Sequence, residues 1–252
     1  MICESVVFCE GYFDRAFWKG WLEHLGCTNL FGKQGRVIDP WRCNVGSGQY
    51  GFMSPGQTFV RVVPCGGKGH VLDQVRIRLE QRATKCIRRV VVNWDADTID
   101  SAFRDGASPK ATVGEIIGKL KPGATPDASG DYLIHLPEDE LPTTLSLVLW
   151  ETPDEPATGL PTKQTLERLC CAAICEVYPQ RGLCVGPWLE SLVEGPPLIP
   201  KSFSWSYMAG WYPDHNCEAF FELLWKDAAV AAALRKRLEH IGAWRVAKAL
   251  IE

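Results

Sequence analysis

The chain of 252 residues lacks several patterns that mark common protein classes. It has no run of about 18 consecutive apolar residues, so the sequence predicts no transmembrane helix. Its first residues lack a basic segment followed by an apolar one, so we expect no secretory signal and a cytoplasmic protein. No Gly-x-Ser-x-Gly motif is present, which argues against a serine hydrolase.

The eleven cysteines include no Cys-x-x-Cys pair. This absence argues against a zinc ribbon and against a thioredoxin-type redox site. Cys171 and Cys175 would share one face of a helix, where a free thiol behaves as a small apolar group. We therefore predict reduced core thiols, and a disulfide scaffold is the alternative.

The composition indicates a folded protein with a substantial core, because 46% of the residues are hydrophobic and 23% are charged. Apolar periodicity predicts alternating strands and helices up to about residue 177 and helices alone after that. The predicted strands cover residues 5–9, 58–63, 87–92, 132–136 and 145–150. The predicted helices cover residues 15–25, 71–86, 112–120, 163–177, 183–192, 203–209, 218–226 and 228–241.

This order predicts an α/β fold with a mostly parallel sheet flanked by helices and a helical C-terminal region. We expect a core over residues 1–180, with a glycine-rich insert around 36–69, and a helical region over 181–252 that packs on or beside it. The insert contains Gly46-Ser-Gly-Gln-Tyr-Gly51, which matches the dinucleotide-binding string. This match does not follow a strand or open a helix, so it predicts no nucleotide site.

Three acidic residues follow two of the predicted strands. Glu10 comes directly after the apolar run 6–9, and Asp95 and Asp97 follow the run 90–94. Ligands of open α/β sheets bind beyond the carboxyl ends of the strands, and carboxylate oxygens suit Mg²⁺. Two such ions would stabilise the attacking and leaving oxygens of a phosphodiester. The alternative is a set of solvated turn acids, with Asp97 capping a helix.

The segments Glu10-Gly-Tyr-Phe-Asp14 and Asn93-Trp-Asp-Ala-Asp97 together resemble a Toprim domain, the catalytic fold of type IA topoisomerases, primases and OLD-family nucleases. The OLD (overcoming lysogenization defect) nucleases are the most similar branch, because they carry a second acid four positions after the first, which is Asp14 here. The resemblance implies that Glu10, Asp14, Asp95 and Asp97 bind metal.

Two further matches to the OLD-like pattern lie downstream. The resemblance implies a metal-binding pair at Thr165 and Glu167, and a catalytic lysine at Lys201. Glu167 could equally be an ordinary first-turn acid of a helix, and Lys201 a solvated lysine. Glu151 and Asp154, which follow the strand over 145–150, are rivals for the third acidic position.

The sequence also departs from the OLD-like pattern. The insert between the two acidic motifs is long, and Trp94 before Asp95 is bulkier than the small or aliphatic residue expected there. No ATPase motif is present: Gly66-Gly-Lys-Gly69 lacks the upstream glycine and the following Ser or Thr of a phosphate loop. An OLD-like protein of this kind would need a separate ATPase partner or act alone.

The net charge of −3 is unusual for a protein that binds nucleic acid, so any basic surface must be local. Residues 73–89 contain six basic and two acidic side chains, and residues 235–248 contain a second basic cluster. Either cluster could contact phosphates or be a solvated face. The ten tryptophans mostly have amphipathic spacing, which favours core packing over base stacking.

The sequence therefore predicts a metal-dependent nuclease that cleaves DNA or RNA with Mg²⁺ or Mn²⁺, with two ions possible. Glu10, Asp95, Asp97 and Lys201 are the predicted catalytic residues. By the OLD resemblance, it would act in phage defence beside a separate ATPase partner, with no membrane association. The alternatives are a non-catalytic Toprim-like interaction module and an enzyme acting on a small phosphate compound. The oligomeric state stays open.

Overall fold

The computed structural model describes residues 2–30, 39–41, 45–46, 48–81, 86–96, 114, 117–118, 121–137, 139–152, 160–161, 163–195, 201–209 and 216–252. The chain forms two compact units. The first contains Met1–Trp94, Ser101–Val148 and Arg245–Glu252, and the second contains Asp95–Asp100 and Leu149–Trp244. The sequence analysis gives one boundary, between residues 180 and 181. The two compact units instead meet in the chain after Trp94, Asp100, Val148 and Trp244.

Seven strands form one mixed sheet in the order β2-β3-β4-β1-β5-β7-β6. They are β1 (Glu4–Cys9), β2 (Thr28–Asn29), β3 (Tyr50–Met53), β4 (Phe59–Pro64), β5 (Ile87–Asp95), β6 (Tyr132–Ile134) and β7 (Thr143–Trp150). β1 pairs in parallel with β4 and β5, whereas β2-β3, β3-β4 and β6-β7 are antiparallel. The predicted α/β fold is confirmed, with a parallel centre and antiparallel edges.

β5 and β7 also run in parallel, because the contacts between them advance together along both strands. Thr143 Oγ1 donates to the Ile87 carbonyl oxygen at 2.6 Å, and Asn93 Nδ2 donates to the Val148 carbonyl oxygen at 3.2 Å. The four central strands β4, β1, β5 and β7 are therefore parallel to one another. Strands buried on both faces carry continuous apolar runs, which is why 5–9 and 87–92 were recognisable as strands.

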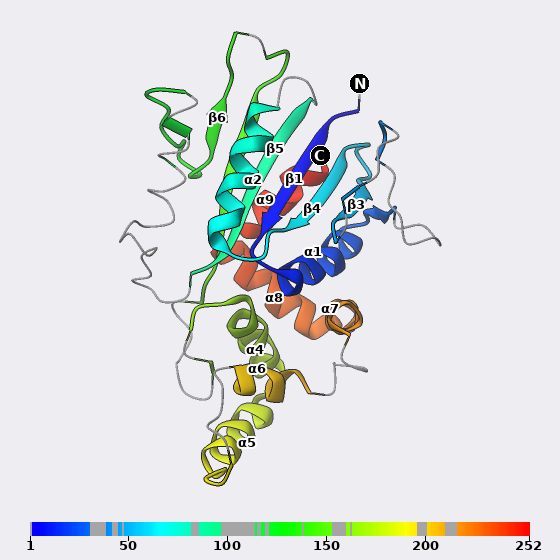
Figure 1. The fold of residues 1–252 in the computed structure, drawn as a ribbon. Coiled ribbons are helices and arrows are strands. Elements are labelled where there is room, and N and C mark those ends of the chain that lie inside the picture. Colours follow the sequence, from blue (N-terminus) through cyan, green and yellow to red (C-terminus); the bar gives the residue numbers. More distant parts are fainter. Residues whose placement is uncertain are drawn as a thin grey trace. The chain divides into compact units, whose positions relative to one another are not determined.

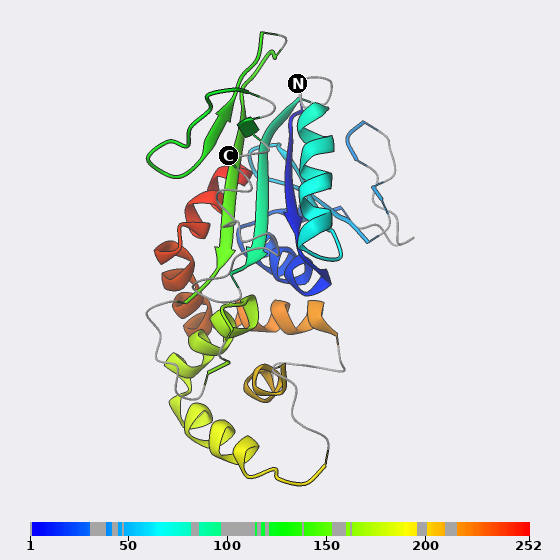
Figure 2. The same cartoon turned by 60° about the vertical axis from the view of Figure 1, so that its left-hand side comes forward.

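Among the described residues of the first unit, three helices cover the sheet: α1 (Tyr12–His24), α2 (Lys68–Glu80) and most of α9 (Ala243–Ile251). α2 and α9 lie on opposite faces (Figures 1 and 2). Trp18 of α1 donates to Asn93 Oδ1. Asn93 shares a face of β5 with Arg89, which lines a cavity together with Ala249 and Leu250 of α9. α1 and α9 therefore cover the same face of the sheet. The helix predicted over 71–86 is α2, which begins three residues earlier and ends at Glu80. The helix predicted over 112–120 falls mostly outside the described residues.

The first helix forms because its apolar side chains recur on one face. Phe17, Trp18, Trp21 and Leu22 are fully buried, and the Trp18 and Trp21 rings stack with centroids 4.8 Å apart. The tryptophans of this helix therefore have the core role that their spacing predicts.

The second unit is helical, with α4 (Leu166–Val177) at its centre. Around it lie α5 (Pro179–Glu190), α6 (Lys201–Met208) and α8 (Ala228–His240), and α7 (Cys217–Lys226) packs on α8. Asn216 and Asp227 cap α7 and α8 by accepting hydrogen bonds from first-turn N–H groups. Because α4 packs with the later helices, the compact unit begins well before residue 181.

The ten cysteines in the described ranges are free. Burial raises the pKa of Cys27 to about 11 and that of Cys65 to about 12, so both thiols stay protonated at neutral pH. Within the same ranges, no helix has the length and apolar character needed to cross a membrane.

Candidate metal centre

The strand register relates the ends of β1 and β5. Cys9, the last residue of β1, pairs with Asn93 of β5 in parallel. Glu10 follows Cys9 directly, and Asp95 is the last residue of β5. Both acids therefore come at the carboxyl ends of neighbouring parallel strands, where ligands of open α/β sheets bind. Asp97, the third predicted acid, lies outside the described residues.

Glu10 is half-buried, and its Oε2 atom is shielded from solvent. Its backbone oxygen accepts a hydrogen bond from Gly67 N at 2.9 Å, so the turn between β4 and α2 packs against it. Gly66 and Gly67 have φ of +74° and +129°, a backbone region that favours glycine. The half-buried Lys68 follows as the first residue of α2.

The sequence motifs do not predict this turn beside Glu10, because Gly66-Gly-Lys-Gly69 does not match an ATPase phosphate loop. The signal that could have identified it is a glycine pair directly after a buried strand and directly before a helix. That combination places the first N–H groups of α2 at the same end of the sheet as Glu10.

Asp14 is buried within α1, and its carboxylate has a structural partner. Asp14 Oδ2 accepts a hydrogen bond from Gly11 N at 3.0 Å. Gly11 is the N-cap of α1, so the helix predicted over 15–25 begins three residues earlier, at Tyr12, and includes Asp14. Asp14 lies in the first turn and stabilises the helix start, where a negative charge is favourable.

Asp95 contacts the segment that contains two other predicted ligands. Asp95 Oδ1 accepts a hydrogen bond from Leu166 N, the first residue of α4, at 2.9 Å. Thr165 is the N-cap of α4, and Thr165 Oγ1 accepts from Arg168 N at 3.3 Å. Glu167 is half-buried in the first turn. Asp95 thus meets the start of α4, which brings it into the same local structure as Thr165 and Glu167.

A buried polar network fixes the start of α4 against the end of β7. Gln164 Oε1 accepts from Thr152 N at 2.6 Å, and Arg168 Nε donates to Thr152 Oγ1 at 2.8 Å. Arg168 NH1 also donates to the Pro161 carbonyl oxygen. Because Arg168 is 3% exposed, these hydrogen bonds hold the helix start in one position.

The remaining candidates are less defined. Glu151 is half-buried directly after β7, and Asp154 lies outside the described residues. Lys201 is the first residue of α6, and its side chain is not among those described.

The donor set suits a hard divalent cation, because carboxylate oxygens are the ligands that Mg²⁺ prefers. The fit rests on Asp95, whose carboxylate is oriented by the N–H of Leu166. Within the described ranges, no three His, Cys, Asp or Glu side chains are grouped closely enough to form a complete metal site.

Acidic partners occupy several of the basic side chains that the structure describes in the two clusters. Arg78 of the first cluster turns to the buried Glu4, at 3.5 Å, and Arg76 is exposed beside Glu80. Arg82 and Lys85 lie outside the described residues, and Arg88 and Arg89 belong to β5.

In the second cluster, Arg235 pairs with Glu239, and Lys236 and Arg237 pair with Glu176. Arg245 pairs with Asp131 at 2.6 Å.

No family model matches the chain, and no curated protein matches its sequence. The chain is similar in fold to the crystal structure of the hypothetical protein PH0156 from Pyrococcus horikoshii OT3, with a TM-score of 0.66. The two chains are 14% identical, and the alignment covers 100% of each. This likeness extends over the whole chain and concerns the fold alone.

Proposed function

We propose that the protein is a metal-dependent nuclease that cleaves DNA or RNA phosphodiester bonds. In this proposal Glu10, Asp95 and Asp97 bind Mg²⁺ or Mn²⁺, and Asp14, Thr165 and Glu167 support the metal site. The observation that carries it is the parallel pairing of Cys9 with Asn93, because Glu10 and Asp95 then follow neighbouring strand ends. The hydrogen bond between Asp95 and the start of α4 adds support.

Bound divalent ions would polarise the phosphodiester and lower the pKa of the attacking water. The chain's own residues would position these ions. The N–H of Leu166 orients the Asp95 carboxylate, and burial on one side limits the positions open to the Glu10 carboxylate. Water would attack phosphorus, the bond from phosphorus to the leaving oxygen would break, and that oxygen would take up a proton. Lys201 is the proposed partner for charge that develops on the phosphate.

The ATPase partner and the role in phage defence are part of the same proposal. They rest on the resemblance of Glu10-Gly-Tyr-Phe-Asp14 and Asn93-Trp-Asp-Ala-Asp97 to OLD-like nucleases, which frequently act with an ATPase.

The test is cleavage of single-stranded DNA, duplex DNA and RNA by the full chain in Mg²⁺ or Mn²⁺. Asp95→Asn is the sharpest variant, because an amide oxygen can still accept the Leu166 N–H while the negative charge is lost. Asp227→Asn is its matched control. Asp227 is also a helix-start aspartate that accepts from backbone N–H groups, those of Ala229 and Val230, but it does not follow a strand.

We expect metal-dependent cleavage by the wild type and by Asp227→Asn, and a loss of at least 100-fold in Asp95→Asn, on the order of one removed transition-state interaction. Equal cleavage by wild type and Asp95→Asn would contradict the proposed site. Absence of cleavage of all three substrates in both metals would contradict the nuclease proposal for the chain acting alone.

A second candidate function is a non-catalytic interaction module. It is favoured by exposed apolar side chains on and just after α5: Leu183 is 67% exposed, Trp188 55% and Val193 88%. Large apolar side chains exposed along one segment would suit contact with another protein. Metal affinity separates the two candidates, because a docking module has no need of Mn²⁺ at its strand ends.

A further inference from the structure

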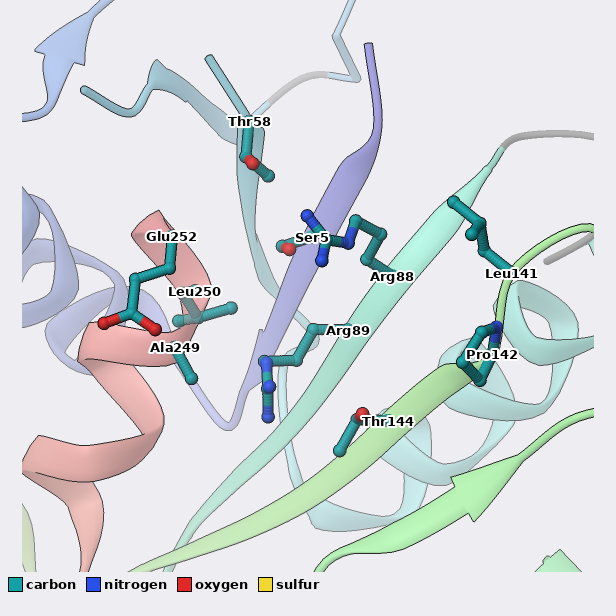
Figure 3. A pocket seen from close by; sticks show the side chains of 10 residues that line it. All are labelled: Ser5, Thr58, Arg88, Arg89, Leu141, Pro142, Thr144, Ala249, Leu250 and Glu252. Atoms are coloured by element: carbon teal, nitrogen blue, oxygen red, sulfur yellow. The ribbon is translucent and has the colours of Figure 1, made fainter. Parts of the chain in front are cut away.

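A cavity of about 150 Å³ lies in the first unit, at the start of β1 and β5 and against the end of α9 (Figure 3). Its polar lining consists of Ser5, Thr58, Arg88, Arg89, Thr144 and Glu252. The proposed metal site belongs to the opposite, carboxyl ends of the same strands. The cavity is therefore a separate feature of the sheet, and its function does not depend on the proposed nuclease.

Two consecutive arginines line this cavity because the strand is irregular where they occur. Side chains of consecutive strand residues normally point to opposite faces. Here the register between β1 and β5 shifts, since Glu4 pairs with Ile87 and Ser5 pairs with Arg89. Arg88 is the extra residue of this bulge, and bulges redirect side chains. Figure 3 shows both arginine side chains extending from β5 toward the side of β1 and α9.

The two arginines differ in their surroundings. Arg89 is half-buried, lies 3.8 Å from Asp131 and donates to Ser146 Oγ at 3.4 Å. Burial lowers the pKa of the Arg89 guanidinium, and the Asp131 carboxylate acts in the opposite direction. Arg88 is exposed and forms no ion pair with any other residue that the structure describes. Arg89 is thus fixed in place, and Arg88 is available to an added anion.

The charged side chains that line the cavity are two guanidinium groups, Arg88 and Arg89, and one carboxylate, Glu252. Asp131 and Arg245 lie nearby, outside the lining. Asp131 is used mainly by Arg245, which it binds through both oxygens at 2.6 and 3.1 Å. The guanidinium groups that face the cavity are therefore weakly neutralised, and an anion that enters gains their attraction.

We propose that this cavity binds a phosphate group, either inorganic phosphate or the terminal phosphate of a small monoester. Guanidinium N–H groups match phosphate oxygens in pairs, and the hydroxyls of Ser5, Thr58 and Thr144 supply further donors to a tetrahedral anion. A cavity of about 150 Å³ accepts a molecule of about the size of benzene, so the ligand is small. The Glu252 carboxylate lines the same cavity and acts on the Arg89 guanidinium, so it competes with this anion.

The test is isothermal titration calorimetry of the full chain with inorganic phosphate and, separately, with methyl phosphate. Arg88→Gln removes one guanidinium without opening a core contact, because Arg88 is exposed. Arg76→Gln is the matched control, since Arg76 is an exposed arginine on α2, outside the cavity. Glu252→Gln removes the competing carboxylate.

We expect saturable binding of phosphate by the wild type, about tenfold weaker binding by Arg88→Gln and unchanged binding by Arg76→Gln. Glu252→Gln should bind several-fold more tightly, and higher salt should weaken binding in each variant. Binding of both probes would indicate that a free phosphate and a monoester share the site, and binding of one alone would identify the source. Absence of binding to both probes, or equal affinities of the wild type and Arg88→Gln, would overturn the proposal.

Discussion

Asn93 connects three elements of the first unit through one buried amide. Its side chain is fully buried, it accepts from Trp18 Nε1 at 2.9 Å and it donates to the Val148 carbonyl oxygen at 3.2 Å. These bonds join α1 and β7 to β5, two residues before Asp95. A buried polar group with both partners satisfied fixes one arrangement of its neighbours, so Asn93 contributes to the position of the strand end.

Asn93→Ala should lower the free energy of unfolding by about 3 kcal/mol, because it leaves the Trp18 N–H and the Val148 carbonyl buried without this partner. Urea unfolding followed by circular dichroism measures the change. Trp18→Phe removes the N–H from the other side, so the double variant should cost about 1 kcal/mol less than the sum of the single variants. Strict additivity would show that the hydrogen bond contributes no coupling.

The residues of the candidate site were partly predictable. Glu10 and Asp95 could be located because each ends an apolar run, and a buried strand must end in a polar turn. The role of Asp14 could not be predicted, since the sequence does not show that Gly11 caps α1 and that Asp14 accepts its N–H. The bulge at Arg88 was equally hidden, because two adjacent arginines in a strand predict side chains on opposite faces.

At the scale of elements, the turn between β3 and β4 packs closely against the end of α9. A Cβ atom added to Gly56 would lie 2.8 Å from the Ile251 carbonyl oxygen and 2.9 Å from that of Glu252. These distances are too short for a side chain, so glycine permits the approach of the two backbones. Thr58 and Glu252 both line the cavity that we propose binds phosphate. The close contact at Gly56 therefore shapes the wall of that cavity.

Gly56→Ala should lower the free energy of unfolding by about 1–3 kcal/mol, because backbone must move to accommodate the methyl group. Gly69→Ala is the matched control. Gly69 lies in the first turn of α2, and a Cβ there meets no atom within 4 Å. That variant should be neutral or more stable by up to about 1 kcal/mol, since alanine favours helix. Equal effects of both variants in urea unfolding would refute the close contact.

The element pattern was predictable wherever apolar periodicity was continuous. The central strands and α1, α2, α4 and α8 follow from it, because each presents a regular apolar face. α9 was missed as a separate helix. α9 begins directly after Gly242, whose φ of +74° separates it from α8. The sequence did not show that a further helix would pack on the sheet.

At the scale of the whole molecule, internal ion pairs use much of the basic charge. Arg61 binds the buried Glu4 and Asp39, Arg78 lies near Glu4, and Arg237 and Arg245 pair with Glu176 and Asp131. A count of basic residues along the sequence could not separate these structural cations from a nucleic-acid surface. With a net charge of −3, the proposed nuclease would need bound metal ions to attract a phosphodiester.

The measurement that tests the central claim most directly is Mn²⁺ binding to the full chain by calorimetry, for the wild type and for Asp95→Ala/Asp97→Ala. The account predicts that the wild type binds one or two Mn²⁺ ions and that the double variant, folded by circular dichroism, loses this binding. Because Asp95 also accepts the Leu166 N–H, Asp95→Asn should weaken Mn²⁺ binding while keeping that contact. Equal Mn²⁺ affinity in all three proteins, or none in the wild type, would contradict the account.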